Sequence, residues 1–325
     1  MTVFIAVTVF FEIYWHSTNL SCIAMTGRSR NLRRRCMMRM ARNFEFDPAY
    51  YTTRYPELGY MNAQEAADHF VQYGIAEGRQ GHPRGSRPTF VEHIAALETI
   101  LEIGPFNAPI ARGNNVRYLD VLDAAQLRQR AEACGMDPNG CPETIHYVGD
   151  ISDIHDSFQG VVSSHCIEHQ PDLIHHLGGV ARLLPVGGFY FLYVPDKRYC
   201  FDHFLPESTI AEVMLAHEER RTTHVLRSVI EHYALVTHND ARRHWIGDHG
   251  VEPFASRVPK VQWAIEHYRN AKDYIDVHAW YFTPDNFWEI MSMLYQSGMS
   301  ALKPVAIYPT LRDELEFFAI LRRDV

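Results

Sequence analysis

Residues Thr99–Ile110 read TILEIGPFNAPI: an apolar run that ends in an acid and a Gly-Pro turn. An apolar run without polar alternation is typical of a parallel strand that is buried on both faces. In open α/β sheets, ligands bind outside the carboxyl ends of the strands, where a glycine lets a ligand approach the backbone closely. We therefore expect a ligand site at the turn that contains Gly104.

A second strand end adds another carboxylate. Val116–Asp120 (VRYLD) is a short apolar run that closes on an acid, and an acid at this place can accept hydrogen bonds from ribose hydroxyls. The three glycines of a dinucleotide fingerprint are missing, because Gly104 is followed by PFNAP. Two strand-end acids, Glu102 and Asp120, without a phosphate-gripping loop favour a nucleoside whose attached group is cationic.

Three more stretches extend this pattern: YVGDI at 147–151, GVVSSHCIEH at 160–169 and GGFYFLYVP at 187–195. Together with LEIGP at 101–105 they resemble the class I S-adenosylmethionine-dependent methyltransferases, over roughly residues 90–325. The resemblance implies an α/β fold with a doubly wound, Rossmann-like seven-stranded sheet that ends in an antiparallel hairpin, and it implies S-adenosyl-L-methionine as cofactor. The family's glycine-rich loop and first helix are compressed here into residues 105–115.

The alternation of apolar runs and helical stretches fits this architecture. We expect strands near 99–103, 116–120, 145–148, 160–164, 188–194, 301–307 and 314–321, with helices near 122–134, 172–184 and 287–296. Between the fifth and sixth strands, a polar helical insertion at about 200–280 holds nine of the nineteen histidines and is expected to cap the substrate side.

A small helical module is expected at 46–83. Asp47 precedes Pro48 as an N-cap, and Asn62 and Glu65 form a capping-box pattern before a helix that ends near Gly74. The helices should pack through five aromatic side chains: Tyr50, Tyr51, Tyr55, Phe70 and Tyr73. The stretch is similar to a module attached to bacterial glycosyltransferases, which implies a glycan context such as polysaccharide biosynthesis. Alternatively, it is a helical hairpin that only packs on the main domain.

Residues 1–42 form a basic N-terminal extension with seven arginines and one glutamate. The apolar stretch at 1–15 is short for a membrane span, and its positive charge follows the apolar run, unlike a secretory signal. Three explanations stay open: initiation at a later methionine (25, 37, 38 or 40), a weak membrane-surface anchor, or a disordered tail.

The composition is that of an ordinary soluble protein, with 46% hydrophobic and 22% charged residues. The formal net charge is −8, and residues 43–325 alone carry about −14. An acidic body argues against a nucleic acid partner. The six cysteines include no CxxC pair, which favours a reducing compartment and a cytoplasmic location.

The resemblance assigns cofactor binding to residues at the strand ends: Glu102, Gly104, Pro105, Asp120, Asp150, Ile151 and His165. Asp120 is expected at the ribose, and Asp150 with Ile151 at the adenine, unless Asp150 is an ordinary loop acid. Glu102 either orients the turn or accepts a bond from the cofactor's amino group.

His165 and His169 are the candidate catalytic residues. Both follow the fourth strand, on the edge where the transferred methyl group would lie. His165 is expected beside the methionine part of the cofactor. A histidine near neutral pH can remove the proton of an oxygen acceptor, so His169 is either a general base or a packed, hydrogen-bonded histidine.

The run His238–His249 gathers histidines and carboxylates, but its spacing matches no zinc pattern and Arg242 and Arg243 oppose a cation. We expect no metal site there. The run instead lines an acceptor pocket, with Arg242, Arg243 and Trp245 as anion or sugar contacts, or forms a hydrogen-bonded cap.

The predicted function is methyl transfer to a small molecule or glycan, with oxygen as the favoured acceptor atom. A non-catalytic Rossmann-like scaffold and a nicotinamide-dependent oxidoreductase are the alternatives.

Overall fold

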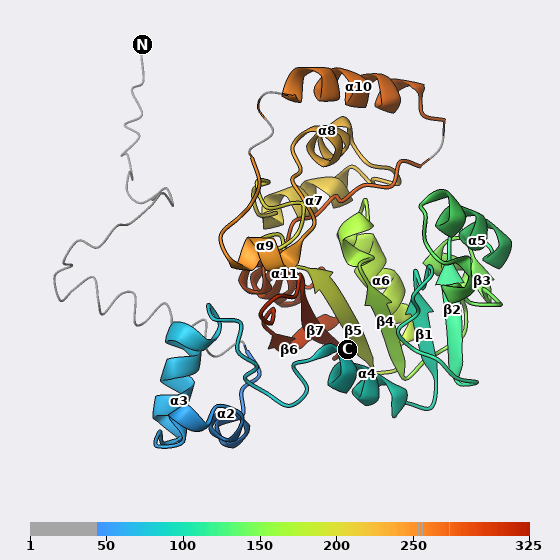
Figure 1. Ribbon diagram of the computed structural model, residues 1–325. Coiled ribbons are helices and arrows are strands. Elements are labelled where there is room, and N and C mark those ends of the chain that lie inside the picture. Colours follow the sequence, from blue (N-terminus) through green and yellow to red (C-terminus); the bar gives the residue numbers. More distant parts are fainter. Residues whose placement is uncertain (1–43, 252–253, 255, 273) are drawn as a thin grey trace, which may run out of the picture. The chain divides into compact units, whose positions relative to one another are not determined.

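The structure is a computed structural model that describes residues 44–251, 254, 256–272 and 274–325 (Figure 1). The basic extension predicted at 1–42, with its three explanations, lies outside these residues. Within them, no helix has both the length and the apolar character needed to cross a bilayer.

A seven-stranded sheet forms the centre of the fold, in the order β3-β2-β1-β4-β5-β7-β6 (Figure 1). The first five strands of this order pair in parallel, β7 runs antiparallel to β5, and β6 runs antiparallel to β7. This confirms the predicted Rossmann-like sheet with an antiparallel C-terminal hairpin, and the strand limits lie within two residues of those expected. The strands are β1 (Ile100–Ile103), β2 (Val116–Asp120), β3 (Tyr147–Val148), β4 (Gly160–Ser164), β5 (Phe189–Pro195), β6 (Leu302–Tyr308) and β7 (Glu316–Arg323).

Successive strand residues enter two different hydrophobic clusters, as the pleat of a sheet requires. Tyr190 of β5 belongs to the cluster that includes α6 (Leu173–Leu183) and α11 (Pro284–Gln296). Its neighbour Phe191 belongs to the cluster on the opposite face, which α4 (Arg87–Ala95) covers. The sheet is therefore buried on both faces, which explains its continuous apolar runs.

The connection from β1 to β2 is a loop: residues 104–115, all of which the structure describes, contain no helix. Helix α5 (Ala124–Ala133) comes only after β2, and the Asp123 side chain caps it by accepting the N–H groups of Ala125 and Gln126. The carboxyl end of β1 is therefore shaped by irregular backbone.

Four helices lie between β5 and α11, in the segment predicted as the insertion (Figure 1). They are α7 (Ile210–Glu218), α8 (Leu226–Ala234), α9 (Ala241–Trp245) and α10 (Arg257–Asn270). Helices α8 and α10 share a separate small cluster, and α7 packs on α6. Helix α11 begins after Thr283, whose hydroxyl and backbone form a capping box with Asn286.

Helices α2 (Pro48–Arg54) and α3 (Ala63–His69) are capped by Asp47 and by the Asn62–Glu65 box, as predicted. The other short turns are η1 (Pro56–Leu58), η2 (Phe70–Gly74), η3 (Pro138–Gly140), η4 (Ile151–Asp153) and η5 (Ile167–His169).

The expected aromatic packing of these helices is confirmed for Tyr51 and Phe70, which are buried, but not for Tyr73, which is 48% exposed. Tyr73 lies in the π-helix η2, which continues α3, and its ring contacts His69 at a centroid distance of 5.4 Å.

Gly78 follows η2 and brings this segment close to the loop before β7. Its carbonyl accepts the N–H of Arg312 at 3.0 Å, and a Cβ at Gly78 would lie 2.4 Å from the same nitrogen. Its φ of +68° also favours glycine.

Phe90 of α4 should be a major support of its sheet face, because it is fully buried, stacks on Phe318 and contacts the rings of Phe191 and Tyr193. We expect Phe90→Ala to lower the free energy of unfolding by about 3–5 kcal/mol, measured by urea denaturation. Glu92→Ala, an exposed change on the same helix, is the control and should shift it by less than about 0.5 kcal/mol. Equal effects of both substitutions would contradict this role.

Candidate functional site

Three predicted site residues meet at the carboxyl edge of the sheet. Ile103 of β1 lies beside Leu119 of β2 and Ser163 of β4, so the residues that follow these strands are neighbours. Gly104 adopts φ +67°, and a Cβ on it would lie 3.6 Å from Sγ of Cys166, an ordinary contact distance. Gly104, Asp120 and His165 thus belong to one edge.

Glu102 is buried beneath this edge and supports the loop. Its two carboxylate oxygens accept the backbone N–H groups of Ile110 at 2.7 Å and Ala111 at 2.9 Å. Burial raises the pKa of Glu102 to about 7, although the two backbone bonds oppose the rise. Both carboxylate oxygens thus bind the loop backbone, and the two predicted roles of Glu102 stay predictions.

Asp120 closes β2 and stays partly exposed. Its Oδ1 accepts the N–H of Leu122 at 3.0 Å, which shapes the turn into α5. Burial raises its pKa, while this bond and the charge of Arg130 counteract the rise.

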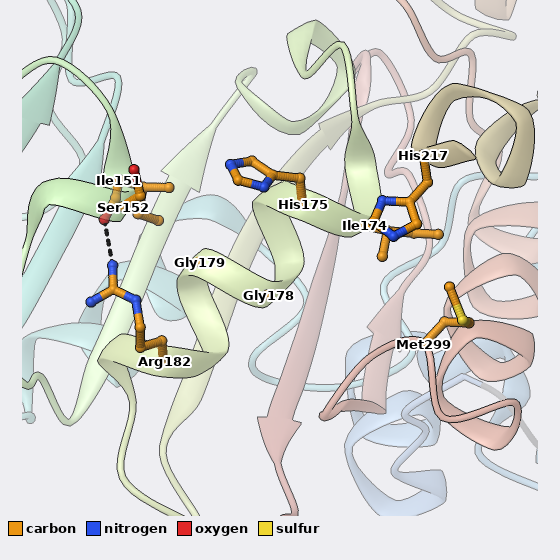
Figure 2. A pocket seen from close by; sticks show the side chains of 9 residues that line it. All are labelled: Ile151, Ser152, Ile174, His175, Gly178, Gly179, Arg182, His217 and Met299. Atoms are coloured by element: carbon orange, nitrogen blue, oxygen red, sulfur yellow. Dashed lines mark hydrogen bonds between the residues drawn. The ribbon is translucent and has the colours of Figure 1, made fainter. Parts of the chain in front are cut away.

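Asp150 and Ile151 follow β3 but face different surroundings. Asp150 is exposed and accepts the N–H of Ser152 at 2.8 Å. Burial acts to raise its pKa, but the bonds from Ser152 lower it overall. Ile151 is buried and lines a cavity of about 370 Å³ beside α6, with His175, Gly179 and Arg182 among the other lining residues (Figure 2). Gly104, Asp120 and His165 are not among the residues that line this cavity, although the N–H of Gly149, two residues before Ile151, donates to the Asp120 carbonyl at 2.9 Å.

Pro105 is buried directly after Gly104, and the next residue, Phe106, has φ +40°. His165 has φ +49°. Among the described non-glycine residues only four have positive φ, and these two lie at the carboxyl edge. Strained backbone is concentrated at functional sites in proteins, which marks this edge as a candidate site.

His165 is held from one side by a carboxylate. Its Nε2 donates to Oε2 of Glu316 at 2.9 Å, and Glu316 also pairs with Arg87. Burial lowers the pKa of His165, but the bond to Glu316 and the charge of Glu168 raise it more.

His169 lies in η5, where its Nδ1 is 2.8 Å from Oδ1 of Asp276. Asp276 pairs with Arg130 as well, so it joins the β2 side of the edge to the β4 side. The pKa of His169 is raised, because the bond to Asp276 and the charge of Glu168 outweigh its burial. A raised pKa favours the protonated imidazole, and the general-base role of His169 stays a prediction.

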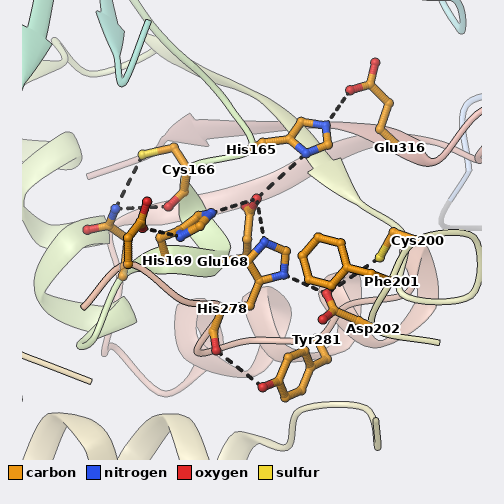
Figure 3. A network of polar contacts seen from close by, with 12 residues as sticks. His165, Cys166, Glu168, His169, Cys200, Phe201, Asp202, His278, Tyr281 and Glu316 are labelled. Carbon is orange, nitrogen blue, oxygen red and sulfur yellow. Dashed lines mark hydrogen bonds and ion pairs between the residues drawn. The ribbon is translucent and has the colours of Figure 1, made fainter. Parts of the chain in front are cut away.

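Glu168, which sequence reasoning did not single out, lies between three histidines (Figure 3). Its Oε1 is 3.9 Å from Nδ1 of His165, 3.7 Å from Nε2 of His169 and 3.8 Å from Nε2 of His278. Nδ1 of His278 donates to Asp202 at 2.6 Å. Glu168 itself is completely buried.

The segment that carries His278 crosses η5 and is fixed to it by hydrogen bonds. The N–H of Ala279 donates to the Glu168 carbonyl at 2.7 Å, and Tyr274 donates its hydroxyl to the His169 carbonyl at 2.9 Å. The indole of Trp280 donates to the Gln170 carbonyl at 2.6 Å. The insertion therefore covers the β4 end of the site.

Side chains of the histidine-rich run 238–249 make contacts within the protein, and its two predicted roles, acceptor pocket or cap, stay predictions. Trp245 stacks on Tyr199, with ring centroids 4.0 Å apart, and its indole donates to the Glu314 carbonyl. Arg243 pairs with Asp248 at 2.8 Å.

Two groups among the described residues bring together side chains that could hold a metal ion. They are Glu168 with His169 and His278, and His203 with His244 and His249. The second group contains two members of the run that the sequence analysis set aside.

No protein-family model matches the chain, and no curated protein matches it in sequence. Solved structures do match. An S-adenosylmethionine-dependent methyltransferase from Mesorhizobium loti is 17% identical, covers 74% of this chain and 99% of its own, and has a TM-score of 0.37. The CcbJ methyltransferase from Streptomyces caelestis is 13% identical over 73% and 93%, with a TM-score of 0.36. A protein described as a Zn-dependent alcohol dehydrogenase, from Rhodobacter sphaeroides, is 13% identical over 76% and 92%, with a TM-score of 0.40. Since every one of these TM-scores is below 0.5, the function proposed below rests on this chain's own residues.

The raised pKa of Glu102 should give stability a specific pH dependence. The folded-state pKa of about 7 exceeds the ordinary 4.5, so the contribution is complete below pH 4.5 and is lost as pH rises through 7. From pH 5 to pH 8, this group should lower the wild-type free energy of unfolding by about 2 kcal/mol.

Glu102→Gln removes the titration, so its pH profile should lack this decrease in urea denaturation at the two pH values. Glu92→Gln, an exposed change, is the control and should keep the wild-type profile. Parallel profiles for wild type and Glu102→Gln would refute the assignment.

Proposed function

We propose that the protein is an S-adenosylmethionine-dependent methyltransferase that methylates a hydroxyl oxygen of a small molecule or glycan. The observation that supports this most is the carboxyl edge itself. It combines the open backbone of Gly104, the carboxylate of Asp120 and the imidazole of His165, on a sheet whose β7 is antiparallel.

The residues of this edge fit a nucleoside with a cationic group. Gly104 has no side-chain clash at its Cα, and partly exposed Asp120 offers a carboxylate for ribose hydroxyls. Asp150 is exposed at the end of β3, where it is proposed to meet the adenine amino group, with Ile151 against the ring. Glu102 is proposed to shape the site indirectly, by binding the backbone of the loop 104–115.

S-Adenosylmethionine, when bound, supplies an electrophilic methyl group on a sulfonium. The protein's part is to orient the acceptor and exclude water. Trp280 and the backbone around it cover η5, beside His165 and His169, and thus shield this end of the edge. We propose these two histidines as the groups nearest the reacting atoms.

The oxidoreductase alternative lacks support, because residues 104–115 offer neither the required glycines nor a helix N-terminus for a pyrophosphate. The acidic body disfavours a nucleic acid acceptor, and the free cysteines among the described residues fit a cytoplasmic protein. A non-catalytic scaffold is the alternative that the following experiment addresses.

Isothermal titration with S-adenosylhomocysteine should release or absorb heat, and the nucleoside should raise the melting temperature. Asp120→Ala should weaken binding about tenfold or more, because a charge-assisted hydrogen bond contributes about 1.5–3 kcal/mol. Asp120→Asn keeps a side-chain oxygen that can accept the Leu122 N–H but removes the negative charge, so it distinguishes loss of the charge from distortion of the turn. Asp153→Ala, which removes an exposed acid, is the control and should bind the nucleoside like wild type.

Unchanged affinity in Asp120→Ala would refute its ribose role. No heat and no thermal shift in the wild type would favour the scaffold.

A further inference from the structure

Glu168 is the centre of a polar cluster that the proposed nucleoside site does not explain. Its side chain is fully buried, and neither of its carboxylate oxygens has a hydrogen-bond partner. A buried carboxylate without hydrogen bonds is strongly unfavourable unless a positive charge compensates it. The compensating charge comes either from a protonated neighbouring imidazole or from a metal ion that the neutral imidazoles bind.

The surroundings of Glu168 have the dimensions of a metal site. The imidazole nitrogens of His169 and His278 lie 3.7 and 3.8 Å from its Oε1, too far for hydrogen bonds, and the three ligand atoms lie within 4.8 Å of one another. Around a tetrahedral cation with bonds of about 2.1 Å, ligand atoms are separated by about 3.4 Å. Small side-chain shifts would bring the three ligand atoms, which Figure 3 shows around Glu168, to this separation.

Carboxylates hold the outer nitrogen of each imidazole. Asp276 lies 2.8 Å from Nδ1 of His169, and Asp202 lies 2.6 Å from Nδ1 of His278. In the neutral imidazole of His278, the hydrogen bond to Asp202 keeps the ring proton on Nδ1, which leaves the lone pair of Nε2 toward Glu168. Asp276 lies close enough to Nδ1 of His169 to favour the same neutral form there. Metal-binding histidines almost always have such outer partners.

We propose that Glu168, His169 and His278 bind a divalent transition-metal ion. Two imidazoles and one carboxylate suit zinc and its neighbours better than Mg²⁺ or Ca²⁺, which prefer oxygen ligands. His165, whose Nδ1 is 3.9 Å from the same Glu168 oxygen, is the most exposed of the three histidines, at 35% of its side chain.

The ion would give the site a further part in the reaction, and this step rests on the proposed methyltransferase function. Three protein ligands leave a coordination position open, as in catalytic zinc sites. An acceptor hydroxyl at that position loses its proton to solvent more readily. Its oxygen then forms the new C–O bond as the C–S bond of the sulfonium donor breaks.

Metal binding is tested on the full chain after EDTA treatment and dialysis. When Zn²⁺ is added back and the excess is removed by dialysis, elemental analysis should find one tightly bound ion per chain. Co²⁺ added in the same way should give a visible absorption band. Glu168→Gln should lower the affinity for Zn²⁺ and for Co²⁺ by at least about 100-fold. Asp202→Asn, which changes only an outer carboxylate, should lower these affinities by about 10–100-fold.

The chain contains its own control, because His203, His244 and His249 form a second histidine group. His244→Ala should keep the tight ion. Melting curves without metal verify that each variant folds, and Zn²⁺ should raise the melting temperature of wild type and His244→Ala but not of Glu168→Gln.

Two results would overturn the site: no retained ion in the wild type, or binding that survives Glu168→Gln and disappears in His244→Ala. These assays contain no nucleoside. Repeating the S-adenosylhomocysteine titration with EDTA therefore tells a failure of the metal site from a failure of the methyltransferase proposal.

Discussion

The carboxyl edge of the sheet depends on the pair of hydrogen bonds that Glu102 accepts from Ile110 and Ala111. Buried backbone N–H groups need partners, and a helix after β1 would pair its own. The loop 104–115 has no helix, so a side chain from the strand beneath it takes over this task. The left-handed backbone of Gly104 and Phe106 lies within the same loop. A single buried carboxylate thus stands in for an element of secondary structure, at the cost of a strongly shifted pKa.

A second connection joins the edge to the insertion. Asp276 pairs with Arg130 in α5, the helix that follows β2, and with His169 in η5, which follows β4. In addition, the Ala279 N–H donates to the Glu168 carbonyl. These bonds place charged side chains from the insertion over strands that lie far from them in sequence. The polar centre around Glu168 therefore forms only when the sheet and the insertion have both folded.

Much of the fold could be predicted from the sequence, because strands and helix starts depend on residues that are close together in the chain. Apolar runs gave the strands, and cap residues such as Asp47 and Thr283 gave helix starts. The strand-end rule also brought Gly104, Asp120 and His165 together. The cluster around Glu168 could not be predicted, since Asp202, Asp276 and His278 reach it only through the path of the insertion. Likewise, no local pattern indicates that Ile151 faces α6 or that Tyr73 is half exposed. The domain limits and the individual site roles stay predictions.

The hydrogen bonds that fix the insertion to η5 have one more consequence. The N–H groups of Ala279 and Trp280 bind the Glu168 carbonyl, so part of this attachment is made by main-chain atoms, which do not change when a side chain is substituted. Those two helices instead share a small cluster of their own around Val229, Ala264 and Val277. Randomising their outward-facing positions is accordingly a practical route for directed evolution: the shape of the cover can be diversified while its main-chain anchor on η5 is kept.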